Sequence, residues 1–272
     1  VLIVNLIYEN SKLTAYTNNG QVFKYNTVYD RFDLLFNLNN LLEDKNFDVY
    51  SLLADNNNNY WIALNTGFYK YQSGKLELID KAVRERYSIT WYDSRQLLIT
   101  SSEGIRQFDT QTLKSKNIYE TNISGPFSVS SVFFDRNQNK VWLGTLSNGL
   151  FIYDFNSGLF SQVLQSTFPR QPVLAIEENS DSTLLIGIDG QGIWEVNKLG
   201  NEVLNVYKES ADDANSLPGN GVYDIFYERG KRVWVATISG GVSFYDLASP
   251  ILTQVVHHSN NENSLVNNDV NG

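Results

Sequence analysis

The sequence predicts an all-β fold, a β-propeller built from four-stranded blades of about 44 residues each. Three features of the chain predict it: a hairpin pattern with a glycine at its tip recurs six times, another strand precedes each hairpin, and a weaker strand follows it. Four strands in about 44 residues match the size of a propeller blade. No helical apolar period competes with this pattern, and only residues 34–42 suit a short helical turn.

Each hairpin reads as strand, small residue, polar tip, glycine and strand. The clearest copies are residues 141–154 (VWLGTLSNGLFIYD), 184–197 (LLIGIDGQGIWEVN) and 233–246 (VWVATISGGVSFYD), and weaker copies begin near residues 13, 60 and 97. The flanking runs are β-branched and aromatic, as strands prefer. A glycine at a hairpin tip supplies a positive φ at no steric cost. We therefore expect a positive φ at the six tip glycines, which are Gly20, Gly67, Gly104, Gly149, Gly192 and Gly241.

Two further strands complete each blade. The fourth strand is clearest at residues 75–80 (KLELID) and 202–208 (EVLNVYK). The first strand of each blade should line the central axis, so the loops that enter it and the hairpin tips should share one end of the blades. First strands are expected at residues 6–9, 49–55, 87–93, 129–135, 173–179 and 222–228.

The repeated tryptophans indicate packing between blades. Trp61, Trp142 and Trp234 occupy the same position in three blades, and a ligand site would not need such repetition. The residue two places after each tryptophan is alanine or glycine, which indicates that the space between neighbouring sheets is tight there.

Most acidic side chains at repeated positions suit turns. Asp109, Asp154 and Asp246 end third strands, where aspartate binds its own backbone. Asp55 and the asparagines at 56–59 could bind calcium, although a solvated turn is favoured. A glycosidase needs two carboxylates about 5–10 Å apart, and 30 acidic residues do not exclude such a pair by number alone.

Composition excludes several classes of function. The chain has 21 basic and 30 acidic residues and a net charge of −9, so nucleic acid is not an expected partner, because phosphate contacts need clustered lysine and arginine. Cysteine is absent, and the two histidines, His257 and His258, are adjacent. Disulfides, thiol nucleophiles and cysteine zinc sites are therefore excluded, and we expect no metal and no other cofactor.

From these residues we expect neither a membrane span nor a secretory signal at residue 1. No run of eighteen apolar residues occurs, and the first ten residues read as a strand. We therefore expect either a cytosolic protein or a mature fragment of an exported one.

The sixth hairpin and the segment before it resemble a known repeat. The Asn-Ser-Leu motif at residues 215–217, followed by Val222 and by residues 233–246, resembles the two-component regulator propeller repeat. That repeat builds the periplasmic sensor region of Bacteroidetes hybrid two-component histidine kinases. A second, partial copy of the motif is at residues 263–270 (NSLVNNDV). The resemblance covers essentially the whole chain, although the blades with tips at Gly20 and Gly104 lack the tryptophan and the Asn-Ser-Leu motif.

This resemblance implies an extracytoplasmic sensor module that binds a glycan-derived oligosaccharide in the periplasm and relays the signal to a kinase. The kinase is not in this sequence, so the module itself is expected to be non-enzymatic. The implied partners are the adjoining propeller and β-sandwich domains of the parent chain, with a homodimer as a further assembly and membrane attachment only through other parts of the parent. Two alternatives stay open: an interaction scaffold that binds no small molecule, and a glycan-cleaving propeller enzyme.

The candidate ligand-binding residues lie where entry loops and hairpin tips should meet around a funnel. Residues 84–86 (Arg-Glu-Arg) are the densest charged cluster, and they precede a first strand. Arginine suits sulfated or uronic glycans because it forms bidentate hydrogen bonds, although ordinary loop roles would explain the same residues. The full funnel set is Arg86, Tyr87, Phe127, Arg170, Asn220, Asn65, Glu103 and Asp189.

The C-terminal residues predict a further blade. Six blades are expected within residues 1–258, and residues 259–272 repeat the lead-in that residues 215–222 make to a complete blade. We therefore expect the chain to be a fragment of a seven-bladed propeller or of a multi-propeller array.

Overall fold

The computed structural model describes residues 3–9, 12–81, 86–121, 127–213, 215–228, 230, 232–238, 240–246, 252–257 and 264–268. Arg84, Glu85, His258 and the ends of the second lead-in copy (Asn263, Asp269 and Val270) lie outside this part of the chain. The chain divides into two compact units, unit 1 (Val1–Val129) and unit 2 (Ser130–Gly272).

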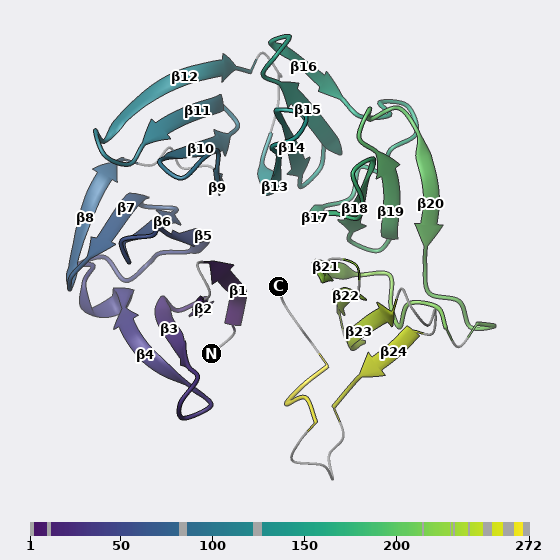
Figure 1. Ribbon diagram of the computed structural model, residues 1–272, viewed down its shortest axis with the longest axis horizontal. Coiled ribbons are helices and arrows are strands. Elements are labelled where there is room, and N and C mark those ends of the chain that lie inside the picture. Colours follow the sequence, from purple (N-terminus) through teal and green to yellow (C-terminus); the bar gives the residue numbers. More distant parts are fainter. Residues whose placement is uncertain are drawn as a thin grey trace. The chain divides into compact units, whose positions relative to one another are not determined.

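Unit 1 contains three four-stranded sheets, coloured purple to blue in Figure 1. Blade 1 consists of β1 (Ile3–Glu9), β2 (Lys12–Thr17), β3 (Gln21–Asn26) and β4 (Arg31–Asn37), and a short 3-10 helix (Leu38–Asn40) follows it. Blade 2 consists of β5 (Val49–Ala54), β6 (Tyr60–Leu64), β7 (Gly67–Gln72) and β8 (Lys75–Asp80). Blade 3 consists of β9 (Ser88–Trp91), β10 (Gln96–Ser101), β11 (Gly104–Asp109) and β12 (Lys114–Glu120).

Unit 2 contains three sheets of the same kind, coloured teal to yellow. Blade 4 consists of β13 (Val129–Asp135), β14 (Lys140–Thr145), β15 (Leu150–Asp154) and β16 (Leu159–Gln162). Blade 5 consists of β17 (Val173–Glu178), β18 (Thr183–Ile188), β19 (Gly192–Asn197) and β20 (Val203–Tyr207). Blade 6 consists of β21 (Val222–Glu228), β22 (Arg232–Thr237), β23 (Gly241–Asp246) and β24 (Leu252–Val255).

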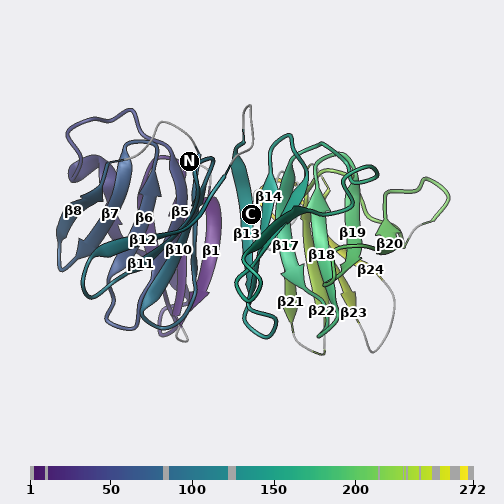
Figure 2. The ribbon, with the colours of Figure 1, turned by 90° about the horizontal axis from the view of Figure 1, so that it is seen from above.

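Every sheet is an antiparallel meander, in which each strand pairs with the next one along the chain (Figures 1 and 2). The protein is therefore all-β, with the six four-stranded blades of a β-propeller, and the predicted fold class is confirmed. The predicted first strands correspond to β1, β5, β9, β13, β17 and β21, and the predicted helical turn corresponds to the 3-10 helix after β4.

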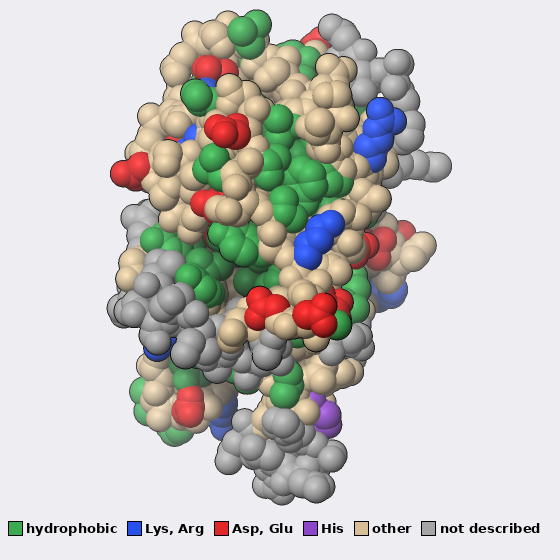
Figure 3. All heavy atoms as spheres, turned by 90° about the vertical axis from the view of Figure 1, so that its right-hand side faces the viewer, with side chains coloured by type: hydrophobic (Ala, Val, Ile, Leu, Met, Phe, Trp, Pro, Cys, Tyr) green, Lys and Arg blue, Asp and Glu red, His purple; other side chains and the backbone are tan. Residues whose placement is uncertain are grey.

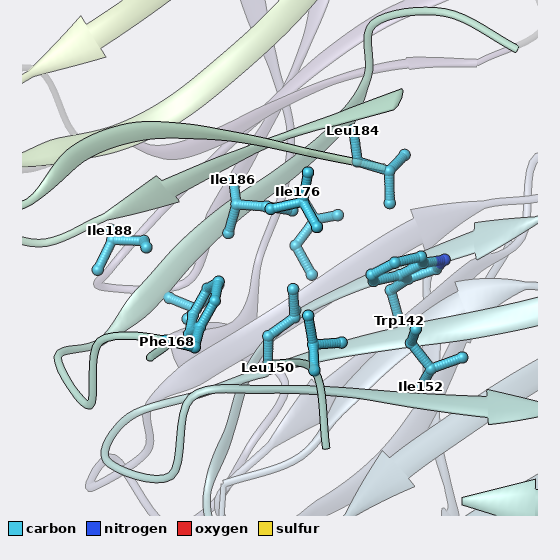
Figure 4. Close-up of a cluster of buried hydrophobic side chains, with 11 residues drawn as sticks. Trp142, Leu150, Ile152, Phe168, Ile176, Leu184, Ile186 and Ile188 are labelled. Carbon is cyan, nitrogen blue, oxygen red and sulfur yellow. The ribbon is translucent and has the colours of Figure 1, made fainter. Parts of the chain in front are cut away.

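Large apolar side chains fill the space between neighbouring blades within each unit. Figure 4 shows the cluster between blades 4 and 5, where Trp142 and Leu150 face Ile176, Leu184 and Ile186. The Trp142 side chain is 0% exposed, and Trp61 is equally buried between blades 2 and 3. The predicted packing role of these two tryptophans is confirmed.

The small residue after the tryptophan allows the next blade to approach closely. A Cβ atom added to Gly144 would lie 2.1 Å from Ser131 Oγ and 2.7 Å from Val173 Cγ1. Val173 begins the first strand of blade 5, so no larger residue fits at this position. The prediction of tight spacing between sheets is confirmed here.

Aspartates organise the turns after the third strands of blades 3 and 4, as predicted. The Asp154 carboxylate accepts hydrogen bonds from the backbone N–H groups of Asn156 and Ser157 after the third strand of blade 4. Asp55 accepts from the backbone N–H groups of Asn57 and Asn59, so its carboxylate serves the turn between β5 and β6.

All six tip glycines have a positive φ, which confirms the hairpin assignment. The conformation matters most at Gly241, where φ is +74° and a Cβ would lie 2.6 Å from the carbonyl oxygen of Val255 in the neighbouring strand. Both the backbone conformation and the space therefore require glycine at this tip.

Replacing Gly241 with valine is expected to lower the free energy of unfolding by about 1–2 kcal/mol or more, because a β-branched residue is strained at positive φ. Denaturant unfolding would measure the loss. Gly219→Val is the matched control, because Gly219 has no positive φ and its added Cβ would meet nothing closer than 3.4 Å. An equal loss in the two variants would contradict the strain argument.

The lead-in segment of one blade docks on the hairpin tip of the blade before it. The tip glycine of blade 5 donates its backbone N–H to the carbonyl oxygen of Asn220 (2.9 Å), and the tip glycine of blade 6 donates to that of Asn268 (2.9 Å). The side-chain oxygens of these asparagines accept from the backbone N–H groups of Glu209 and His257 respectively. The segment at 264–268 thus occupies on blade 6 the place that 216–220 occupies on blade 5, and the further blade stays a prediction.

Candidate functional site

The entry to a first strand and the tip of the hairpin lie at the same end of a blade. In blade 2, the backbone N–H of Asn65 at the tip donates to the carbonyl oxygen of Asp48, which precedes β5 (3.2 Å). In blade 5, the N–H of Asp189 donates to the carbonyl oxygen of Pro172, which precedes β17 (2.9 Å). The shared end predicted from the repeat is therefore confirmed for individual blades.

Unit 1 contains five of the eight predicted funnel residues, and two of them are core residues. The Tyr87 side chain is 6% exposed and donates its hydroxyl to the carbonyl oxygen of Gly67 (2.8 Å). Burial is the main reason that the pKa of Tyr87 is raised. Phe127 is 3% exposed. Tyr87 packs in the cluster shared by blades 2 and 3, both rings are buried, and their role in ligand binding stays a prediction.

The other three predicted residues of unit 1 are more accessible. Arg86 is exposed, and its guanidinium group lies over the Tyr50 ring, 5.7 Å from the centroid. Glu103 is exposed at the tip of blade 3 and lines a cavity of about 370 Å³. Asn65 is half-buried, and its side-chain oxygen accepts from the backbone N–H of Asp48 (2.9 Å).

Unit 2 contains the remaining three predicted residues. Arg170 is exposed in the loop that enters β17. Asp189 and Asn220 lie close to each other, because Asn220 docks on the tip of blade 5 and an added Cβ on Gly221 would lie 3.4 Å from Asp189 Oδ1. Asn220 uses both its backbone carbonyl and its side-chain oxygen for this docking, so it has a structural role at this end of the blade.

A second candidate site, which the sequence analysis missed, is a cavity of about 580 Å³ between blades 5 and 6. The carboxylate of Glu195 on β19 lines it and is held by three neutral donors: Asn179 Nδ2 at 2.9 Å, Asn205 Nδ2 at 2.7 Å and the Tyr207 hydroxyl at 3.0 Å. The Glu195 side chain is 8% exposed. Charged side chains are seldom buried without a purpose or a partner, so this carboxylate marks the cavity as a candidate binding site.

The sequence does contain a signal that could have identified Glu195, but it is visible only when the same repeat position is compared in all six blades. Glu195 lies three residues after its tip glycine, and the same position is Phe23, Lys70, Gln107, Ile152 or Phe244 in the other blades. No other blade has an acid there. The residue after β17 is Asn179, while the corresponding residues in the other complete first-strand motifs are acidic. The position of Glu195 is therefore not a fixed packing position of the repeat.

The inner strand of blade 6 contains a carboxyl group with an unusual pKa. Burial raises the pKa of Asp224 to about 6 from 3.8, although the N–H of Ile225 stabilises the carboxylate at 2.9 Å and so lowers it. The folded protein therefore binds this proton more tightly than the unfolded chain does.

Asp224→Asn is expected to stabilise the protein by about 2 kcal/mol at pH 7, because the half-buried, desolvated group then carries no charge. The folded-state pKa lies above the unfolded value, so wild-type stability should fall as the pH rises from about 4 to about 6 and the cost should remain above that window. Melting temperatures of the two proteins at pH 4 and pH 7 would test this. A constant difference between them at the two pH values would contradict it.

No protein-family model and no curated protein matches the sequence. Among solved structures, the chain is similar to the extracellular domain of BT4673 from B. thetaiotaomicron, described as a one-component system in one structure (TM-score 0.67, 22% identity, covering 86% of this chain and 31% of that chain). A second structure, described as a hybrid two-component system, gives a TM-score of 0.67 at 17% identity and covers 98% of this chain and 41% of that one. A computationally designed protein, Ika8, gives 0.60 at 11% identity over 93% of this chain and 73% of that one.

These comparisons agree with the resemblance predicted from the repeat, because the similar natural structures are extracellular domains of a Bacteroidetes signalling system. At these identities the likeness establishes the fold, and the chain spans less than half the length of the BT4673 structures. Within the part of the chain that the structure describes, no helix has the length and apolar character needed to cross a membrane.

Proposed function

We propose that this chain is the periplasmic sensor module of a hybrid two-component system and that it binds a glycan-derived oligosaccharide without cleaving it. The fold that it shares with the extracellular domain of BT4673 supports a sensor. The observation that carries the proposal is the exposure of two basic side chains, Arg86 and Arg170, beside first-strand entries. Signal output would pass through adjoining propeller and β-sandwich domains of a parent chain, which could also form a homodimer.

The exposed arginines favour an anionic glycan as the ligand. Guanidinium groups bind carboxylate and sulfate groups through paired hydrogen bonds, and an exposed group is available to a ligand at little structural cost. With a net charge of −9, the protein as a whole repels anions, so local arginines would have to provide the attraction.

Replacing Arg86 or Arg170 with alanine is expected to weaken the binding of a uronic or sulfated oligosaccharide by about 1–3 kcal/mol, the scale of a charge-assisted hydrogen bond. Calorimetry with a panel of glycans would measure the change. Arg31→Ala is the matched control, because Arg31 is exposed on the fourth strand of blade 1 and pairs with its neighbour Asp33. Unchanged affinity in both test variants would contradict the arginine site.

A scaffold without a ligand is the second candidate, and the burial of Tyr87 and Phe127 favours it. A sugar site normally presents an aromatic face, and these two rings are committed to the core. If no glycan in the panel binds and the wild-type chain instead forms a stable dimer or complex with its adjoining domains, the scaffold is the better description.

A further inference from the structure

We infer that the cavity between blades 5 and 6 is a binding site for an uncharged sugar, recognised through the carboxylate of Glu195. The inference rests on the proposed function only in taking a sugar as the ligand class, and the residues that line its site include neither Arg86 nor Arg170. The cavity volume of about 580 Å³ lies within the range of about 300–1,000 Å³ that is typical of small-molecule sites.

The walls of the cavity combine apolar and polar groups in the way that sugar rings require. Leu185 and Ile193 of blade 5 and Val233 and Val235 of blade 6 supply apolar surface, and the rings of two tyrosines, Tyr207 and Tyr245, also line the cavity. A pyranose ring has apolar C–H faces and a polar edge of hydroxyl groups, so it can use both kinds of wall. Figure 3 shows hydrophobic side chains gathered on the side of unit 2 that bears the outer strands, with charged side chains around them.

The Glu195 carboxylate is suited to accept hydrogen bonds from a ligand. Two carboxylate oxygens offer about four acceptor positions, and Asn179, Asn205 and Tyr207 fill three of them. A ligand hydroxyl can occupy the fourth and make a charge-assisted bond inside a largely buried site. Glu195 forms no ion pair among the described residues, and a second acid, Asp213, also lines the cavity. The ammonium group of Lys208, another lining residue, donates to Gln191, so the two acids favour an uncharged sugar over a uronic acid or a sulfate.

The backbone supports this arrangement. The pairing of β19 with β20 shifts register between Glu195 and Val196, so that Asn205 lies opposite Glu195 while Val196 pairs with Val203. Such bulges re-aim side chains and are common next to binding sites. Here the irregular pairing accompanies the placement of an amide and a phenol from β20 on one carboxylate.

The lead-in segment forms one side of the cavity and could report its occupancy. Ser216 and Leu217 line the cavity and belong to the Asn-Ser-Leu motif that leads into blade 6. Leu217 is buried in the cluster shared by blades 5 and 6. A ligand in the cavity would thus contact both blades and the segment that connects them.

The test uses neutral disaccharides (cellobiose, xylobiose and galactobiose) and digalacturonate as an anionic probe of matched size. Binding is followed by saturation-transfer NMR and calorimetry up to about 10 mM, which detects Kd values near 1 mM. We expect at least one neutral disaccharide to bind. Glu195→Gln should weaken that binding about 10- to 100-fold, because it replaces an ionised acceptor by a neutral one.

A second variant blocks the cavity without touching the Glu195 network. Val206 lines the cavity and is 45% exposed, so Val206→Trp should fill the space, leave the melting temperature near that of wild type and abolish binding. Val255→Trp is the matched control, because Val255 is similarly exposed (38%) on the outer strand of blade 6 and does not line the cavity.

The outcomes separate this inference from the proposed function. Loss of neutral-sugar binding in Glu195→Gln and Val206→Trp, with no change in Arg170→Ala or Val255→Trp, supports the cavity site even if no anionic glycan binds. Unchanged binding in both cavity variants, or no binding by any neutral disaccharide, overturns the cavity site. In that case, binding of digalacturonate that is weakened by Arg86→Ala or Arg170→Ala would still support the proposed sensor function.

Discussion

Replacing Lys198 with alanine is expected to lower the free energy of unfolding by about 3–5 kcal/mol, the cost of removing one partner from a buried ion pair. The Lys198 side chain is 1% exposed, and its Nζ lies 3.1 Å from an oxygen of Asp135, which is also 1% exposed. The same Nζ donates to Glu178. The variant would leave the Asp135 carboxylate buried in blade 4 without a counter-charge.

The electrostatics of Lys198 reflect two opposing effects. Desolvation alone would lower its pKa, but hydrogen bonds and charge interactions with Glu178 and Asp135 outweigh it, so the pKa of Lys198 is raised and the side chain stays protonated. Urea unfolding of Lys198→Ala at pH 7 would measure the loss, with Arg31→Ala as the exposed-pair control. The control should lose no more than about 1 kcal/mol. A similarly small loss for Lys198→Ala would show that the ion pairs of Lys198 with Asp135 and Glu178 do not stabilise the fold.

Replacing Trp142 with alanine is expected to cost about 3–5 kcal/mol, because it truncates a fully buried side chain and leaves a cavity. Trp142 packs against Leu150 and Ile152 of its own blade and against Ile176 and Leu184 of blade 5 (Figure 4). The loss should appear as a lower midpoint of chemical denaturation.

The repeat itself provides the control for this experiment. Trp234 has the same repeat position in blade 6 but is only half-buried, and it packs on Phe244 at 4.8 Å between ring centroids. Trp234→Ala should therefore cost clearly less than Trp142→Ala. A loss below about 1 kcal/mol for Trp142→Ala would mean that the indole does not support the junction between blades and would make a ligand role worth testing.

The repeat is the reason that the fold could be predicted from one sequence. Each copy combines strand-forming residues with a tip glycine, and these local requirements are the same in every blade. Strands such as β5, β13 and β21 therefore begin where the pattern places them, and Gly241 has the positive φ that a hairpin tip requires. Repetition also identified Trp61 and Trp142 as packing residues, because six copies of one supersecondary unit must bury the same face.

The candidate sites could be predicted only in part. The pattern places entry loops and tips at one end of a blade, and the backbone hydrogen bonds agree. It does not tell which side chain points into the core, so Tyr87 and Phe127 looked like ligand-facing aromatics although they are buried.

What the sequence by itself determined is the repeating unit: its strands, its tips and its packing residues, all of which depend on neighbours a few positions away. What only the tertiary structure decided is the set of contacts between positions that the repeat does not relate. Lys198 meets Asp135 from the preceding blade, and Glu195 meets Asn179 from the turn after β17 and Asn205 from β20. Those contacts depend on how side chains fill the space between sheets, and buried charges are stable only where that three-dimensional arrangement provides partners.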